Sequence, residues 1–246
     1  MRFGLLFIII NAANLLNAQT AKEIVARADE LIRAKSSYAE VKMTIFKPDW
    51  SREMELKMWS LEPDYALILI TSPAKDKGTV TLKREKEVWN WVPAVHRVIK
   101  IPPSMMMQDW MGSDFSNDDL VKESSIVQDY YHELIGEEQK EGYLCYKIKM
   151  TPKPEAGVVW GKIMTWISKD GYLQLQADYY DEDDFLIKSM IGSDIKSLGG
   201  RTIPTHWEMI PVDKPGQKTV MDYLALEFNI KIEESYFSQQ NMKRIR

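Results

Sequence analysis

The spacing of hydrophobic residues near the start of the chain is that of a helix. Between residues 20 and 35, apolar side chains recur every three or four positions, which places them on one helical face. Thr20-Ala21-Lys22-Glu23 has the pattern of a capping box, in which the first and fourth residues satisfy each other's backbone amides. We therefore predict a helix over 20–35 whose apolar stripe covers the core. The stripe consists of Ala21, Ile24, Val25, Ala28, Leu31 and Ile32.

After Ser37 apolar and polar residues alternate for most of the chain, the period of a strand with one buried face. The alternation is clearest at 41–45, 53–60 and 144–150. Further strands are predicted near 64–71, 78–84, 87–92, 95–101, 159–168, 173–181, 185–192, 202–210 and 218–230. Helical segments interrupt them only near 105–122 and at the C-terminal end, which excludes a βαβ arrangement. We predict a mainly β fold: an incomplete antiparallel β-barrel, or half-barrel, of ten or more strands, with an N-terminal helix and short lid helices over an apolar interior.

The longest apolar run lies at the N-terminus. Arg2 precedes the apolar stretch Phe3–Leu16, and Asn17-Ala18 provides a small residue before Gln19. The stretch is shorter than the roughly 20 residues that span a membrane, and the pattern is that of a secretory signal peptide. A buried first strand and an uncleaved anchor are the alternatives. We predict that residues 1–18 are a signal peptide and that 19–246 form a single domain.

Cysteine usage and charge narrow the class of protein. Cys145 is the only cysteine, so we expect no internal disulfide and no lipid anchor at the mature N-terminus. The net charge is −4 with no basic block, so the surface that neutralises phosphates in nucleic-acid-binding proteins is missing. We therefore predict a soluble exported protein that binds no nucleic acid.

The chain holds 14 Met and 8 Trp at a mean hydropathy of −0.33. Several of them share a strand face in pairs, and five of the seven residues at 105–111 are Met or Trp with no strand alternation. Such a segment is typical of a lid over a barrel mouth, because flexible, polarisable Met side chains suit acyl chains; plain core packing is the alternative. The predicted lipid-binding residues are Met54, Met58, Trp89, Trp91, Met105, Met106, Met107, Trp110, Met111, Phe115, Met164 and Trp166.

Two stretches of the chain carry a family resemblance. Residues 91–101 (WVPAVHRVIKI) and 110–120 (WMGSDFSNDDL) resemble the hallmark of the outer-membrane lipoprotein-sorting protein family, relatives of the periplasmic lipoprotein carrier LolA. The resemblance implies an incomplete antiparallel barrel whose apolar interior is plugged by helices. It also implies a periplasmic carrier that shields the acyl chains of a lipoprotein or another lipid on the way to the outer membrane. An inner-membrane transporter as donor, an outer-membrane acceptor and a monomeric carrier are the corresponding expectations.

The motif residues also have a physical interpretation. Arg97 shares a strand face with Val95, Ile99 and Ile101, so its guanidinium needs a rim position or an acceptor. Asp114 is the candidate partner. The pair is a latch that closes the lid in the empty protein, or a fixed structural salt bridge; alternatively, Arg97 meets the polar end of a lipid. Gly112 would serve as a hinge, and Ser116 with Asp119 three residues on predicts a further helix start.

Enzyme chemistry has little support in the sequence. His96, His132 and His206 fall in separate strands or loops, without a catalytic motif. Residues 114–118 resemble the start of a calcium loop, but Ser125 stands where such a loop needs Glu. Residues 105–107 could bind Cu(I) through thioethers, yet they lack nearby His or Cys partners. We expect no metal and no cofactor.

Two functions remain, with a hydrolase as a distant third. One is the lipid-shielding carrier; the other is a soluble periplasmic accessory or binding domain with a packed core, which partners an inner-membrane transporter. A void of several hundred Å³ lined by Met and Trp would favour the carrier.

Overall fold

The computed structural model describes residues 19–121, 125–158 and 160–246. The predicted signal peptide, residues 1–18, lies outside the described residues. A single 13-stranded sheet dominates the fold, with the order β6-β5-β4-β3-β2-β1-β13-β12-β11-β10-β9-β8-β7. The strands are β1 (Ser36–Lys47), β2 (Trp50–Leu61), β3 (Tyr65–Ser72), β4 (Val80–Arg84), β5 (Glu87–Val92), β6 (Arg97–Ile101), β7 (Tyr130–Lys140), β8 (Tyr143–Pro152), β9 (Lys162–Ser168), β10 (Gln174–Tyr180), β11 (Leu186–Leu198), β12 (Arg201–Pro211) and β13 (Lys218–Phe228).

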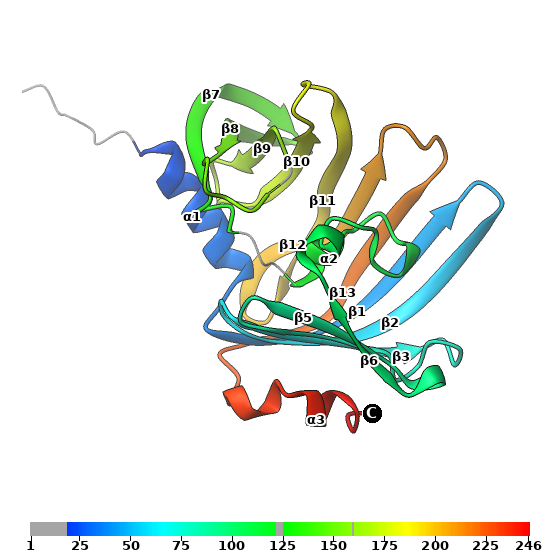
Figure 1. Cartoon of the computed structure of the whole chain (residues 1–246). Helices are drawn as coiled ribbons and strands as arrows, with labels where there is room; N and C mark the ends of the chain where they lie inside the picture. The colour runs from blue at the N-terminus through cyan, green and yellow to red at the C-terminus, as the bar shows by residue number, and fades with distance from the viewer. Residues whose placement is uncertain (1–18, 122–124, 159) are drawn as a thin grey trace, which may run out of the picture.

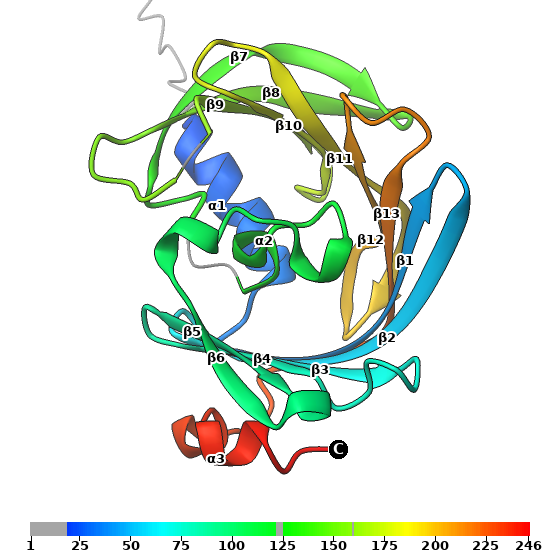
Figure 2. The same cartoon turned by 45° about the vertical axis from the view of Figure 1, so that its right-hand side comes forward.

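Each strand pairs antiparallel with its neighbours. The strands form two meanders, β1–β6 and β7–β13, which join where β1 pairs with β13. The sheet curls strongly but is not closed, because β6 and β7 are its two edges. Figures 1 and 2 show the sheet wrapping around two helices. The predicted mainly β half-barrel is confirmed.

The N-terminal helix begins at its capping box. In α1 (Ala21–Ile32), the Thr20 amide donates to Glu23 Oε2 at 2.8 Å and the Glu23 amide donates to Thr20 Oγ1 at 3.2 Å. Ile24, Val25 and Ala28 are buried against β7–β10 residues. The helix is shorter than the predicted 20–35 because Arg33 is already extended.

The remaining helices are short. They are η1 (Pro93–Val95), η2 (Pro103–Met105), η3 (Trp110–Gly112), α2 (Asn117–Val121), η4 (Glu234–Tyr236) and α3 (Gln239–Met242). The segment predicted to be helical near 105–122 therefore holds two single turns and one short helix. Strand β7 is absent from the predicted set because most of it is exposed, including Tyr131, Leu134 and Ile135, so apolar residues do not alternate along it.

Apolar side chains cover both faces of the sheet. On the concave face, residues of β1–β3, β12 and β13 pack around Trp110 and Phe115. On the convex face, Leu67, Leu82 and Trp89 pack against Phe237 and Met242. In Figure 1 the C-terminal segment, coloured red and including α3, lies on the opposite side of β3–β6 from α2. Residues 229–246 thus cover a second apolar layer, outside the curl.

Candidate functional site

A cavity of about 230 Å³ lies inside the curl of the sheet. Its floor is the concave face, including Met58, Ile68 and Met221, and Phe115 and Leu120 close it from the opposite side. The lining is mainly apolar and aromatic. The further lining residues are Asp29, Ile32, Arg33, Ser37, Ala39, Trp59, Ser60, Glu62, Ala66, Asp118, Asp119, Val121, Ile126, Tyr130, Trp160, Ile163, Gln174, Tyr179, Met190, Ile203, Pro204, Trp207, Tyr223 and Leu226.

The segment that closes the cavity is residues 102–121, which we call the plug. Figure 2 shows the plug, with α2, inside the curl of the sheet. The plug is held together by its own hydrogen bonds: Asn117 Nδ2 donates to the carbonyls of Met105 at 3.0 Å and Gln108 at 3.1 Å. At the start of α2, the Ser116 amide donates to Asp119 Oδ2 at 2.7 Å and the Asp119 amide to Ser116 Oγ at 3.1 Å. The predicted helix start at Ser116 is confirmed, and the plug is a compact unit.

Two buried contacts fasten the middle of the plug to the sheet. Trp110 is 2% exposed, and its indole Nε1 donates to Thr81 Oγ1 at 3.0 Å. Thr219 Oγ1 donates to Asp114 Oδ2 at 2.6 Å and accepts from the Asp114 amide at 2.9 Å. Lys47 Nζ lies 3.4 Å from Asp114 Oδ1. Because buried polar groups are costly to leave unpaired, these contacts hold the plug against the sheet.

A third contact joins α2 to the opposite part of the sheet. Lys188 Nζ, on β11, lies 2.6 Å from Asp119 Oδ2, and both side chains are largely buried. The ammonium lies 5.1 Å from the ring centroid of Trp160 and 5.3 Å from that of Tyr179. Burial is the main cause that raises the pKa of Tyr179, with Asp119 adding to it. The phenol of Tyr179 therefore stays neutral beside an ion pair.

A second polar cluster also lines the cavity. Arg33 lies 2.7 Å from Asp29 and 2.9 Å from Glu62, and all three residues line the cavity. These carboxylates belong to α1 and to the turn after β2, so none of the cluster is part of the plug.

The structure brings together part of the predicted lipid-binding set. Met58 and Phe115 line the cavity. Met54, Met106 and Trp110 belong to the buried cluster that surrounds it, and Met111 packs against that cluster. Met105 and Met107 lie on the plug; Met105 is 38% exposed, and neither is among the residues that line the cavity.

Four residues of the predicted set lie on the wrong face. Trp89 and Trp91 alternate with Val88, which faces the interior, and pack on the convex side under the C-terminal segment. Met164 and Trp166 alternate with the cavity residue Ile163, and they pack with Cys145, Leu173 and Leu175. Alternation shows that two side chains share a face, but it does not show which face is concave.

The predicted pairing of Arg97 with Asp114 is not formed. Arg97 is exposed on the edge strand β6, whereas Asp114 is 5% exposed and is paired with Lys47 and Thr219. The physical reason is the position of the plug, which turns Asp114 toward β1 and β13. At the predicted hinge, Gly112 has φ +80° and Met111 has φ +52°, so the chain makes a left-handed bend there.

The sequence patterns did not predict several residues of the site, above all Lys47, Lys188, Thr81 and Thr219. Lys188 could have been noticed as a charged residue at an inward position of β11, two residues before Met190. Its partner lies 69 positions away in sequence, so no local pattern identifies the pair.

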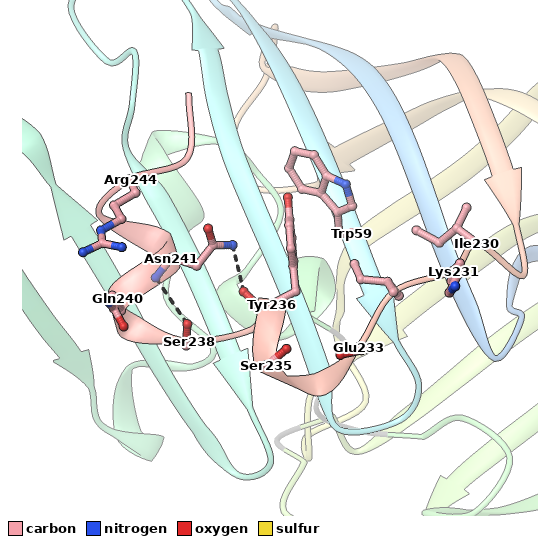
Figure 3. A pocket seen from close by; sticks show the side chains of 11 residues that line it. Trp59, Ile230, Lys231, Glu233, Ser235, Tyr236, Ser238, Gln240, Asn241 and Arg244 are labelled. Carbon is pink, nitrogen blue, oxygen red and sulfur yellow. Dashed lines mark hydrogen bonds between the residues drawn. The ribbon is translucent and has the colours of Figure 1, made fainter.

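A second hollow, of about 510 Å³, lies on the outer surface along the C-terminal segment. Figure 3 shows Trp59 and Tyr236 next to each other in its lining, with ring centroids 5.7 Å apart. Two of its polar side chains contact the local backbone: Asn241 Nδ2 donates to the Tyr236 carbonyl at 2.8 Å, and Ser238 Oγ accepts from the Asn241 amide at 3.2 Å. It is a surface groove with a mixed lining, so the interior cavity is the better candidate site.

Two further observations concern the described residues. Among them, no group of three His, Cys, Asp or Glu side chains is arranged to hold a metal ion. Within the same part of the chain, no helix is long and apolar enough to cross a membrane.

Comparison with known proteins adds family and fold relationships. A family model described as "uncharacterized protein" matches residues 62–244. A DUF1329 family protein from Desulfovibrio piger is 27% identical, with a TM-score of 0.82 over 90% of this chain and 97% of that one. None of the curated protein sequences matches the chain.

Two other solved structures share the fold. A putative outer membrane lipoprotein-sorting protein domain from Vibrio parahaemolyticus is 22% identical, with a TM-score of 0.81 over 91% of this chain and 98% of that one. A LolA superfamily protein from Nitrosomonas europaea is 21% identical, with a TM-score of 0.78 over 91% and 99% of the two chains.

Proposed function

We propose that this chain, which belongs to the family whose model matches residues 62–244 and shares its fold with LolA-superfamily and lipoprotein-sorting proteins, is a carrier for lipid acyl chains. In this proposal the acyl chains of a lipoprotein or another lipid occupy the interior cavity while the cargo crosses the periplasm. Residues 1–18 direct export, and residues 19–246 act as one monomeric carrier domain. An inner-membrane transporter supplies the cargo and an outer-membrane acceptor receives it. No residue is assigned a catalytic role.

The observation that carries the proposal is a mainly apolar cavity closed by a separate segment of chain. Protein interiors are close-packed and keep few voids larger than a water molecule. A cavity of about 230 Å³ between a curled sheet and a plug is therefore unlike ordinary core packing. It supports the carrier over an accessory domain with a packed core.

The size of the cavity supports a plug that moves. Pockets for small molecules commonly measure about 300–1,000 Å³, so the closed cavity is small for a long acyl chain. The plug adds Trp110, Phe115 and Leu120 to the interior. If the plug moves out of the sheet as a unit, the space that these side chains fill becomes available to the cargo.

A reversible cross-link tests this proposal. Asp114 and Thr219 are in contact, so we would replace both by Cys in a Cys145→Ser background and form a disulfide between plug and β13. We expect the oxidised protein to take up little pyrene-labelled phospholipid, and dithiothreitol to restore uptake. The single variant Asp114→Cys in the same background, oxidised in the same way, is the control for loss of the carboxylate.

Two results would count against the carrier. Equal uptake by the oxidised and reduced double-Cys protein would show that the plug is not the entry. A wild-type protein that takes up no labelled phospholipid, and carries no lipid in native mass spectrometry after purification from its own cell envelope, would rule out the function itself.

A further inference from the structure

The plug is acidic where it meets the sheet, and three lysines oppose it. Asp109, Asp114 and Asp119 lie 3.7, 3.4 and 2.6 Å from the ammonium groups of Lys214, Lys47 and Lys188. The Lys214 pair is half-exposed at the rim, whereas the Lys188 pair is largely buried. Opening the plug would thus separate charges at three places, and the pairs of Lys47 and Lys188 are largely buried.

Lys188 lies next to the cavity wall. Its ammonium contacts the rings of Trp160 and Tyr179, which both line the cavity, and Met190 is the next inward residue along β11. When the plug leaves, Asp119 goes with it, and the ammonium loses this ion pair. Once a ligand fills the space that the plug leaves, the ammonium is again shielded from water, and a buried charge without a counter-charge is strongly unfavourable. The open protein therefore favours a ligand that returns a negative charge to this place.

The polar cluster around Arg33 would not lose its counter-charges when the plug opens. Arg33 is paired with Asp29 and Glu62, which lie outside the plug and stay in place when it opens. Asp118, a further carboxylate at the cavity, lies on α2 with Asp119. Opening therefore removes negative charge from around Lys188 and leaves the ion pairs of Arg33 unchanged.

We infer, on the basis of the proposed carrier function, that Lys188 receives the anionic end of an amphiphilic ligand, whose carboxylate or phosphate takes the place of Asp119. Trp160 and Tyr179 then flank the head of the ligand, and the apolar lining from Met58 to Met221 takes its acyl chain. In the closed protein the Asp119 carboxylate occupies the position that the anionic head takes in the complex. The head of the ligand and Asp119 therefore compete for one ammonium, so that ligand binding favours release of the plug.

Matched pairs of amphiphiles test the inference in the wild-type protein. Palmitate and hexadecanol share a chain but differ in charge, and phosphatidic acid and diacylglycerol do the same for a phosphate head. We expect each anion to bind about tenfold or more tightly than its neutral partner, as for other hydrogen bonds to charged groups. The two pairs also show whether the carboxylate or the phosphate is preferred.

Variants test whether the preference for anions depends on Lys188 and Asp119. Asp119→Asn keeps an acceptor for the Ser116 amide but removes the competing charge, so it should bind palmitate several-fold more tightly. The neutral double variant Lys188→Met/Asp119→Asn should bind palmitate and hexadecanol equally, while Lys188→Arg keeps the preference. Lys42→Met is the matched control, because Lys42 pairs with Glu53 at a partly exposed site outside the cavity lining.

The outcomes separate this inference from the proposed function. If neutral and anionic amphiphiles bind wild-type protein equally well, the carrier function stands and the role of Lys188 is refuted. A preference for anions that survives in the neutral double variant also refutes it. If no amphiphile binds, both proposals fail together.

Discussion

His206 shows how a single side chain on the outer face can make stability depend on pH. Its ring Nδ1 lies 2.6 Å from Asp222 Oδ1 and its Nε2 lies 3.4 Å from Glu208 Oε1. Burial lowers the pKa of His206, but the hydrogen bonds and charges of the two carboxylates outweigh it, so the pKa lies above its usual value. In His132, by contrast, burial lowers the pKa.

We predict opposite pH trends for these two histidines. A raised pKa in the folded state means that His206 contributes fully below its unfolded pKa of about 6.5, and that the contribution is lost as the pH rises through the folded value. The gap in free energy of unfolding between wild type and His206→Gln should therefore narrow from pH 5.5 to 8.5.

For His132 the sign reverses. Protonation is disfavoured in the folded state, so the wild type loses stability relative to His132→Gln as the pH falls. Urea unfolding at several pH values measures both gaps. If the two differences in free energy of unfolding changed in the same direction with pH, the opposite pKa shifts of His206 and His132 would be contradicted.

At the scale of elements, the plug depends on backbone geometry as well as on contacts. Its course from η3 to α2 requires left-handed conformations at Met111 and Gly112. A Cβ at Gly112 would meet no atom within 4 Å, so a substitution there changes the backbone preference without a clash. This isolates the bend from the packing around it.

We predict that Gly112→Ala destabilises the protein by about 1–2 kcal/mol, the cost of a left-handed conformation for a residue with a Cβ. Gly136→Ala is the matched control, because a Cβ there also meets nothing within 4 Å and its φ is not in the left-handed range. Urea unfolding compares the two variants, and limited proteolysis reports whether the plug loosens. Equal effects at both positions would argue against strain at the bend.

The elements also show where sequence reasoning succeeds. The capping box at Thr20, the strand alternation and the helix start at Ser116 are local patterns, and each forms as predicted. The orientation of faces is not local: Met54 and Trp89 have similar alternating surroundings, yet Met54 faces inward and Trp89 faces the C-terminal segment. Likewise, Arg97 and Asp114 both belong to the family-like motif, but in the fold Asp114 pairs with Lys47.

At the scale of the whole molecule, the sheet carries apolar layers on both of its faces. The plug and α1 fill the concave side, and residues 229–246 cover β3–β5 on the convex side. Phe237 is fully buried there, and its ring lies 5.6 Å from that of Tyr65. The C-terminal segment is thus part of the core and not an appendage.

We predict that Phe237→Ala costs about 3–5 kcal/mol of stability, as for other large-to-small changes in a core. Phe185→Ala is the control, because Phe185 is 67% exposed and surface changes usually stay within about 0.5 kcal/mol. Thermal and urea unfolding measure both. A cost at Phe237 no larger than at Phe185 would show that the convex layer contributes little.

If the chain is a carrier, as proposed, the open edges of the sheet determine how it adapts to the size of its cargo. In a closed barrel the diameter is fixed by the number of strands and their stagger, whereas here β6 and β7 end the sheet without pairing to each other among the described residues. We expect the curl to relax by bending, which separates these edges while every ladder of hydrogen bonds stays intact. The stiffness of the sheet then limits how wide a cargo can be. Cargoes with more acyl chains should push the edges β6 and β7 further apart.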